Sequence, residues 1–130
     1  MTTNTLVRKP QHITMEESDL VKEAVLLPVL LTMIRRDMDR MQNSSASPHR
    51  LCLPNIVVMQ RMLEMIQIDL VQLKQRLRSA GIRIYIEVKD AQGIRCKYIC
   101  RENRGSLTLS RSMVKAEISI LAGNYVHSRI

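Results

Sequence analysis

The chain has 130 residues, of which 45% are hydrophobic, and a net charge of +8 from 20 Lys and Arg against 12 Asp and Glu. This length suffices for one compact domain, and the composition excludes disordered, collagen-like and disulfide-stabilised proteins. No apolar run reaches the roughly 18 residues that a membrane-spanning helix needs. Because the first fifteen residues contain no signal-peptide core, we expect a cytoplasmic protein.

A long helix is predicted over Glu16–Gln42. Thr14 and Glu17 have the spacing of a capping box, in which each side chain binds the backbone N–H of the other residue. The apolar positions that follow are spaced alternately four and three residues apart, which is typical of a helix that packs along one seam. Pro28 interrupts the pattern, so the segment is either one kinked helix or two helices. The seam comprises Leu20, Ala24, Leu27, Leu31, Ile34, Met38 and Met41.

A second long helix is predicted over Pro54–Ala80, after a loop at Asn43–Pro48. Gly81 is placed to end this helix in the left-handed conformation. The two helices have 27 residues each, about 40 Å, which favours an antiparallel helical hairpin resembling a coiled coil. The alternative is that the second helix packs against its copy in another chain. Its seam comprises Ile56, Met59, Leu63, Ile66, Leu70, Leu73, Leu77 and Ala80.

After Gly81 the period changes to two, which predicts a β-hairpin with its turn at Asp90–Gly93. A third short strand over Leu107–Leu109 is compatible with the pattern. Ser110 is a plausible N-cap for a last helix that ends at Gly123 or Asn124. The predicted inner face of the hairpin comprises Ile82, Ile84, Ile86, Val88, Ile94, Cys96, Tyr98 and Cys100.

These elements predict an α+β fold, in which a long antiparallel helical hairpin is followed by a β-hairpin, or three short strands, and a C-terminal helix. Residues 1–13 are polar and basic without periodicity, which predicts a flexible basic tail. We expect residues 14–130 to form a single α+β domain.

The positive charge is concentrated in the second half of the chain. Residues 15–41 have a net charge of −2, whereas residues 74–104 have a net charge of +6. If the hairpin strands alternate as predicted, five cations point away from the core on one face. This face is a hypothetical binding surface for a polyanion or an acidic partner. Its residues are Arg83, Lys89, Arg95, Lys97 and Arg101.

Motifs for catalysis or cofactor binding are absent from the sequence. It contains none of the glycine motifs that hold phosphates, no zinc-protease histidine pair and no nucleophile elbow. Cys96 and Cys100 lie about 13 Å apart along one strand, too far for a disulfide or a shared zinc ion, so we expect buried thiols. We therefore expect no catalytic, metal or cofactor-binding residues and no enzymatic activity.

Two functional hypotheses remain open. The first is a small basic, non-enzymatic interaction or regulatory protein that acts by docking to a partner protein or to a second copy of itself. The alternative is a nucleic-acid-associated protein that binds phosphates through the basic outer face of the 82–101 hairpin. With three Tyr, no Phe and no Trp, the sequence offers few side chains for stacking on bases. The sequence does not identify the partner.

Overall fold

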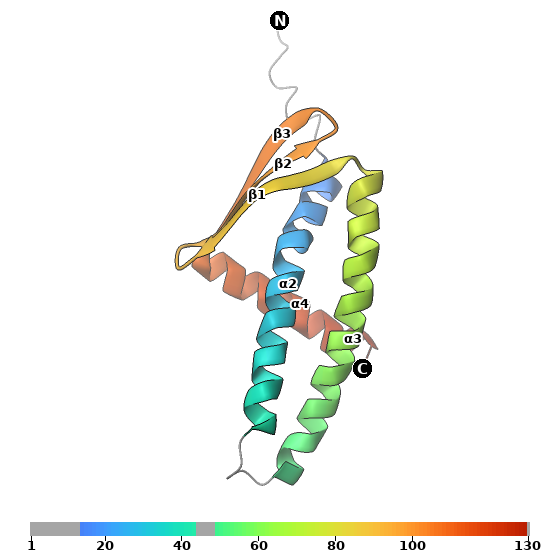
Figure 1. Ribbon diagram of the computed structural model, residues 1–130, viewed down its shortest axis with the longest axis vertical. Helices are drawn as coiled ribbons and strands as arrows, with labels where there is room; N and C mark the ends of the chain where they lie inside the picture. Colours follow the sequence, from blue (N-terminus) through green and yellow to red (C-terminus); the bar gives the residue numbers. More distant parts are fainter. Residues whose placement is uncertain (1–13, 44–48, 130) are drawn as a thin grey trace, which may run out of the picture.

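A computed structural model describes residues 14–43 and 49–129, except for the side chains of 49–54 and 128–129. Two long antiparallel helices, α2 (Met15–Gln42) and α3 (His49–Ser79), form the predicted helical hairpin. A three-stranded sheet lies across one end of the hairpin, and the last helix crosses behind it (Figure 1). The α+β prediction is confirmed, whereas the predicted tail and most of the predicted loop lie outside the described residues.

Helix α2 begins with the predicted capping box. The Glu17 backbone N–H donates to Thr14 Oγ1 over 3.1 Å, and the Thr14 N–H donates to Glu17 Oε1 over 3.0 Å. The segment is one helix that continues through Pro28. Proline removes the backbone hydrogen bond to the Ala24 carbonyl, and Thr32 Oγ1, one turn after Pro28, donates to the Pro28 carbonyl over 3.0 Å.

The predicted start of α3 is wrong, and its predicted end is close to the observed one. The helix begins at His49 rather than at Pro54, so Pro54 lies within it, where proline removes one backbone hydrogen bond and crowds the preceding turn. Gly81 follows the last turn with a φ of 74°, as expected for a left-handed residue that ends a helix.

The sheet consists of β1 (Ile82–Asp90), β2 (Gly93–Cys100) and β3 (Asn103–Ser110), antiparallel in the order β1-β2-β3. The third strand is therefore much longer than the Leu107–Leu109 segment. It pairs with β2 along its whole length, so β1 and β3 are the edge strands of the sheet within the described residues.

Helix α4 (Arg111–Arg129) follows β3 directly. Ser110 is its cap, as predicted, since the Met113 N–H donates to Ser110 Oγ over 3.3 Å. The predicted end at Gly123 or Asn124 is wrong. The hydroxyl of Tyr125 donates to the Asp69 carboxylate on α3, and this contact accompanies a further helical segment beyond the glycine.

The hydrophobic core lies between the helical hairpin, α4 and the inner face of the sheet. Both predicted helical seams contribute to it, but the most buried α2 residues lie beside the seam, because this helix is covered on more than one side. The fully or almost fully buried residues include Val21, Val25, Leu26, Leu27, Ile66, Cys96, Cys100 and Leu109. Lys22 on α2 and Glu117 on α4 form an ion pair of 3.5 Å at the edge of this core.

An ion pair joins the sheet to the first turn of α2. Arg101 lies in the turn between β2 and β3, with a φ of 58°, a strained conformation for a residue other than glycine. Its guanidinium binds Glu17 in a two-pronged contact, with Nη1–Oε2 at 2.6 Å and Nη2–Oε1 at 3.1 Å. The Arg101 N–H also donates to the Gly81 carbonyl over 2.8 Å. These contacts offset the strain and tie the β2–β3 turn to α2 and to the junction between α3 and β1.

The pH dependence of stability reports on this ion pair. The hydrogen bond from Arg101, followed by that from the Thr14 N–H, lowers the pKa of Glu17 from 4.5 to about 2. Because the folded-state pKa is the lower one, the Glu17 carboxylate stabilises the fold above about pH 4.5, and this contribution is lost as the pH falls towards 2. We expect Glu17→Gln to be less stable than the wild type at neutral pH, with the difference closing over that pH interval in urea denaturation curves.

Glu16→Gln is the matched control, since it removes an equal charge from the same helical turn. Its free energy of unfolding should differ little from that of the wild type, and this difference should not shrink as the pH falls. If Glu17→Gln lowered the free energy of unfolding equally at pH 2 and at neutral pH, the stabilising role of the Glu17 carboxylate would be contradicted.

Candidate functional site

A bulge in β1 determines which side chains reach the outer face of the sheet, the face that points away from the helices. Ile84 pairs with Tyr98 and Ile86 pairs with Lys97, so Tyr85 is an extra residue with no partner in β2. One extra residue in a strand turns all following side chains to the opposite face.

Ile86 and Val88 therefore lie on the outer face, where 44% and 41% of their surface is exposed. The prediction that they belong to the inner face is wrong beyond the bulge. Glu87 and Lys89 take the inner positions instead, opposite Cys96 and Ile94 of β2, and form a mutual ion pair of 3.2 Å.

Three rows of paired residues make up most of the outer face, and a fourth row, Asp90–Gly93–Ser110, lies at its end and adds the Asp90 carboxylate. No helix of the described part of the chain covers the three rows, and none of their nine residues is acidic. The rows combine four cations, three aliphatic side chains and two hydroxyls, so the face is both cationic and partly apolar. The rows are Arg83–Ile99–Arg104, Ile86–Lys97–Ser106 and Val88–Arg95–Thr108.

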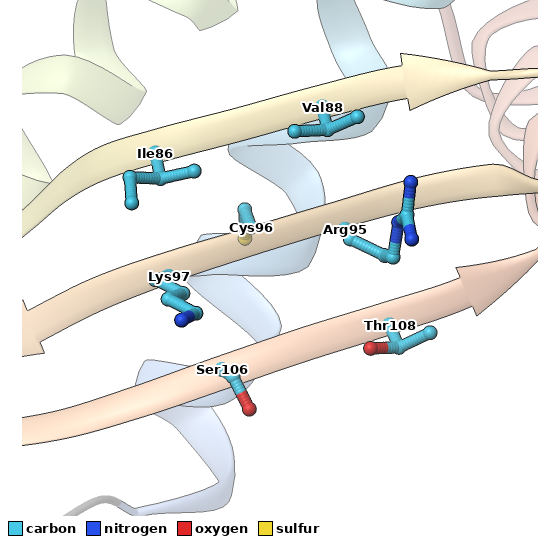
Figure 2. Close-up of a pocket in the computed structure, with 7 residues that line it drawn as sticks. All are labelled: Ile86, Val88, Arg95, Cys96, Lys97, Ser106 and Thr108. Carbon is cyan, nitrogen blue, oxygen red and sulfur yellow. The ribbon is translucent and has the colours of Figure 1, made fainter.

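The outer face contains a shallow hollow of about 390 Å³. Figure 2 shows the aliphatic side chains of β1 on one side of it, the two cations of β2 in the middle and the hydroxyls of β3 on the other. Arg95 is held by Asp90 at the end of β1, with Nη2–Oδ2 at 2.6 Å, whereas Lys97 forms no ion pair with a described residue. The lining residues are Ile86, Val88, Arg95, Cys96, Lys97, Ser106 and Thr108.

The structure brings together only three of the five predicted cations. Arg83, Arg95 and Lys97 share the outer face, as predicted. Lys89 does not, because the bulge turns it to the side of Ile94. Arg101 does not, because it lies in the β2–β3 turn and binds Glu17. The predicted common surface of all five is therefore wrong, and the binding role of the three that remain is still a prediction.

Sequence reasoning missed several residues of this face. Ile86 and Val88 were expected in the core, and no glycine or proline next to Tyr85 marks the bulge. Arg104 lay outside the predicted strands, although it is the third residue of the row that begins with Arg83. The hydroxyls of Ser106 and Thr108 could have been placed only by recognising that β3 extends upstream of Leu107.

The two buried thiols, Cys96 and Cys100, are free, as expected. Burial is the main cause that raises the pKa of both, so the neutral thiol is favoured over the nucleophilic thiolate. Within the residues that the structure describes, no group of three or more His, Cys, Asp and Glu side chains could hold a metal ion.

The fold and the outer face define a small α+β protein whose sheet presents a cationic, partly apolar surface. Residues 12–130 match the family model described as YhjD protein, so the chain belongs to the YhjD family. No curated protein and no solved structure shows significant similarity to the chain. None of the described helices has the length and apolar character required to span a membrane.

Proposed function

We propose that this protein is a non-enzymatic cytoplasmic interaction protein whose outer sheet face docks an acidic, partly apolar segment of another protein. The observation that carries the proposal is the position of Ile86 and Val88, which the bulge places in one hollow with Lys97 and Arg95. A face that only maintained solubility would gain nothing from two exposed aliphatic side chains beside its cations.

Charge complementarity selects the chemistry of the partner. The three rows contain four cations, and only Arg95 among them is paired with a described carboxylate, that of Asp90. The face therefore keeps an excess of positive charge, so an acidic segment is attracted and a basic one is repelled. Burial of the two aliphatic side chains favours a segment that also carries apolar residues. A second copy of the chain fits less well, because each copy has a net charge of +8 and the two identical faces would repel each other.

Nucleic acid is the less favoured occupant of this face. None of the nine side chains in the rows is aromatic, whereas proteins that bind single strands use aromatic side chains as stacking platforms. Tyr85, at the bulge, is 41% exposed and is an isolated exception. The exposed aliphatic side chains of β1 would also lie against phosphates without any compensating contact.

Synthetic peptides of equal length test the proposal: one alternates Glu with Val, one alternates Lys with Val, and one contains Glu without Val. We expect the Glu–Val peptide to bind in fluorescence anisotropy and to perturb the amide resonances of the outer rows. The Lys–Val peptide should not bind, and the peptide without Val should bind more weakly. Ile86→Ser and Lys97→Glu should each weaken Glu–Val binding by about tenfold or more.

The matched controls are Ile120→Ser and Lys115→Glu, which change exposed residues of α4 in the same way. Both controls should bind the Glu–Val peptide like the wild type. A mixed-sequence DNA duplex that binds the outer rows more tightly than the peptide, with steep salt dependence, would overturn the proposal in favour of nucleic acid. Dimerisation that is lost in Ile86→Ser would overturn it in favour of a second copy.

A further inference from the structure

A second hollow lies where α3 meets β1, and it is separate from the hollow of the outer face. Its volume is about 490 Å³, and it is formed by the last two turns of α3 and the first residues of β1. The lining residues are Lys74, Leu77, Arg78, Gly81, Ile82, Arg83 and Ile84. We call this hollow the junction cleft.

Three of the seven residues that line the junction cleft are cations. Lys74 and Arg78 are one helical turn apart on α3, and Arg83 is added from β1. Like charges four residues apart destabilise a helix, so the repulsion between Lys74 and Arg78 lowers the stability of α3 and brings no benefit to the fold.

Described carboxylates do not offset the charge of the junction cleft. Five other cations of the described chain each form an ion pair with Asp or Glu, whereas none of the cleft cations does so. The paired cations are Lys22, Arg40, Lys89, Arg95 and Arg101. The cleft therefore concentrates positive charge that an external anion would neutralise.

The remaining cleft residues provide an apolar surface and a backbone donor. Leu77 and Ile84 are half-buried, and Ile82 is 6% exposed. Because the Gly81 carbonyl accepts the Arg101 N–H from the β2 side, the next peptide N–H, that of Ile82, points away from β2. An anion on that side of β1 can receive this hydrogen bond in addition to those of the cations.

We propose that the junction cleft binds a multiply charged phosphate compound that carries an apolar group. Its phosphates would lie among Lys74, Arg78 and Arg83, because guanidinium groups match the geometry of phosphate oxygens and three cations call for more than one negative charge. Its apolar part would lie on Leu77 and Ile84. The proposal and the docking function share Arg83, but Lys74 and Arg78 do not belong to the outer face, so replacing these two residues tests the cleft separately.

Calorimetric titration with two probes, inorganic tripolyphosphate and adenosine triphosphate, tests the proposal. We expect both to bind the full chain at low ionic strength, with the nucleotide tighter because only it has a group for the apolar surface. The double variant Lys74→Gln/Arg78→Gln should bind each probe at least about tenfold more weakly. Binding should shift the backbone amide resonances of Gly81 and Ile82.

The matched control is Arg61→Gln/Arg76→Gln, which removes the same charge from exposed positions of the same helix outside the cleft. It should bind both probes like the wild type, and thermal unfolding should show that both double variants are folded. Equal losses in the two variants, or no binding of either probe to the wild type, would overturn the proposal. If tripolyphosphate bound as tightly as the nucleotide, the proposed contact of an apolar group with Leu77 and Ile84 would be wrong.

Discussion

Replacing Ile66 with glutamate is expected to unfold the chain. Ile66 has 0% of its surface exposed and lies in the seam of α3 that faces the core. Loss of its packing costs about 2–5 kcal/mol, and burial of an unpaired carboxylate adds to this cost. Since small domains are stable by about 5–15 kcal/mol, most of the folding free energy would be removed. Far-ultraviolet circular dichroism and urea denaturation would measure the loss.

Ile68→Glu provides a closely matched control for this prediction. The substitution is chemically identical and two residues away on the same helix, but Ile68 is 58% exposed. Its free energy of unfolding should change by less than about 1 kcal/mol. If Ile66→Glu instead gave a folded monomer from a dimeric wild type, the α3 seam would pack against a second chain, and the intramolecular hairpin would be wrong.

The helical part of the fold was predictable because its determinants are local. The capping box of Thr14 and Glu17, the seams with steps of three and four, and the left-handed Gly81 depend on residues close in sequence. The boundaries that were missed depend on distant contacts or on the preceding chain. Helix α4 extends past Gly123 where Tyr125 binds Asp69, a residue 56 positions away.

The faces of the sheet were predictable only as far as the bulge. Ile82 and Ile84 lie on the inner face as their alternation predicts, and the alternation continues unbroken through Ile86 and Val88. A bulge without glycine leaves no mark in such a pattern. Its position depends on how β1 pairs with β2, and pairing across strands is not encoded in the period of one strand.

The candidate site was predictable in composition but not in arrangement. The charge count located the cations along the chain, but the ion pair of each cation depends on the folded structure. Arg101 binds Glu17, which is 84 residues away, whereas Arg95 binds Asp90, which is five residues away. Pairing removes Arg101 from the predicted surface, and the bulge removes Lys89. The surface that remains is smaller and more apolar than the predicted one.

Gly93→Ala is expected to destabilise the protein by about 2–5 kcal/mol. Gly93 is buried where β2 begins and has a φ of 137°, a conformation that side-chain-bearing residues rarely adopt. A Cβ atom there would lie 2.0 Å from the Leu109 carbonyl oxygen and 3.0 Å from the carbonyl carbon of Ser110. Both are backbone atoms of β3, so no side-chain rotation relieves the overlap. Urea denaturation would measure the change.

Gly123→Ala makes the same substitution at a position that has neither a positive φ nor a close backbone contact. Apart from the backbone of its own helix and its chain neighbours, no described atom lies within 4 Å of a Cβ at this position, so the variant should be more stable than the wild type by about 0.5–1 kcal/mol. Opposite signs for the two variants would show that the close approach of β2 and β3 needs glycine at 93. Equal changes would contradict this. Ser110 both pairs with Gly93 and caps α4. If the added methyl group of Gly93→Ala pushes β2 and β3 apart, amide exchange in the first turn of α4 should therefore also increase.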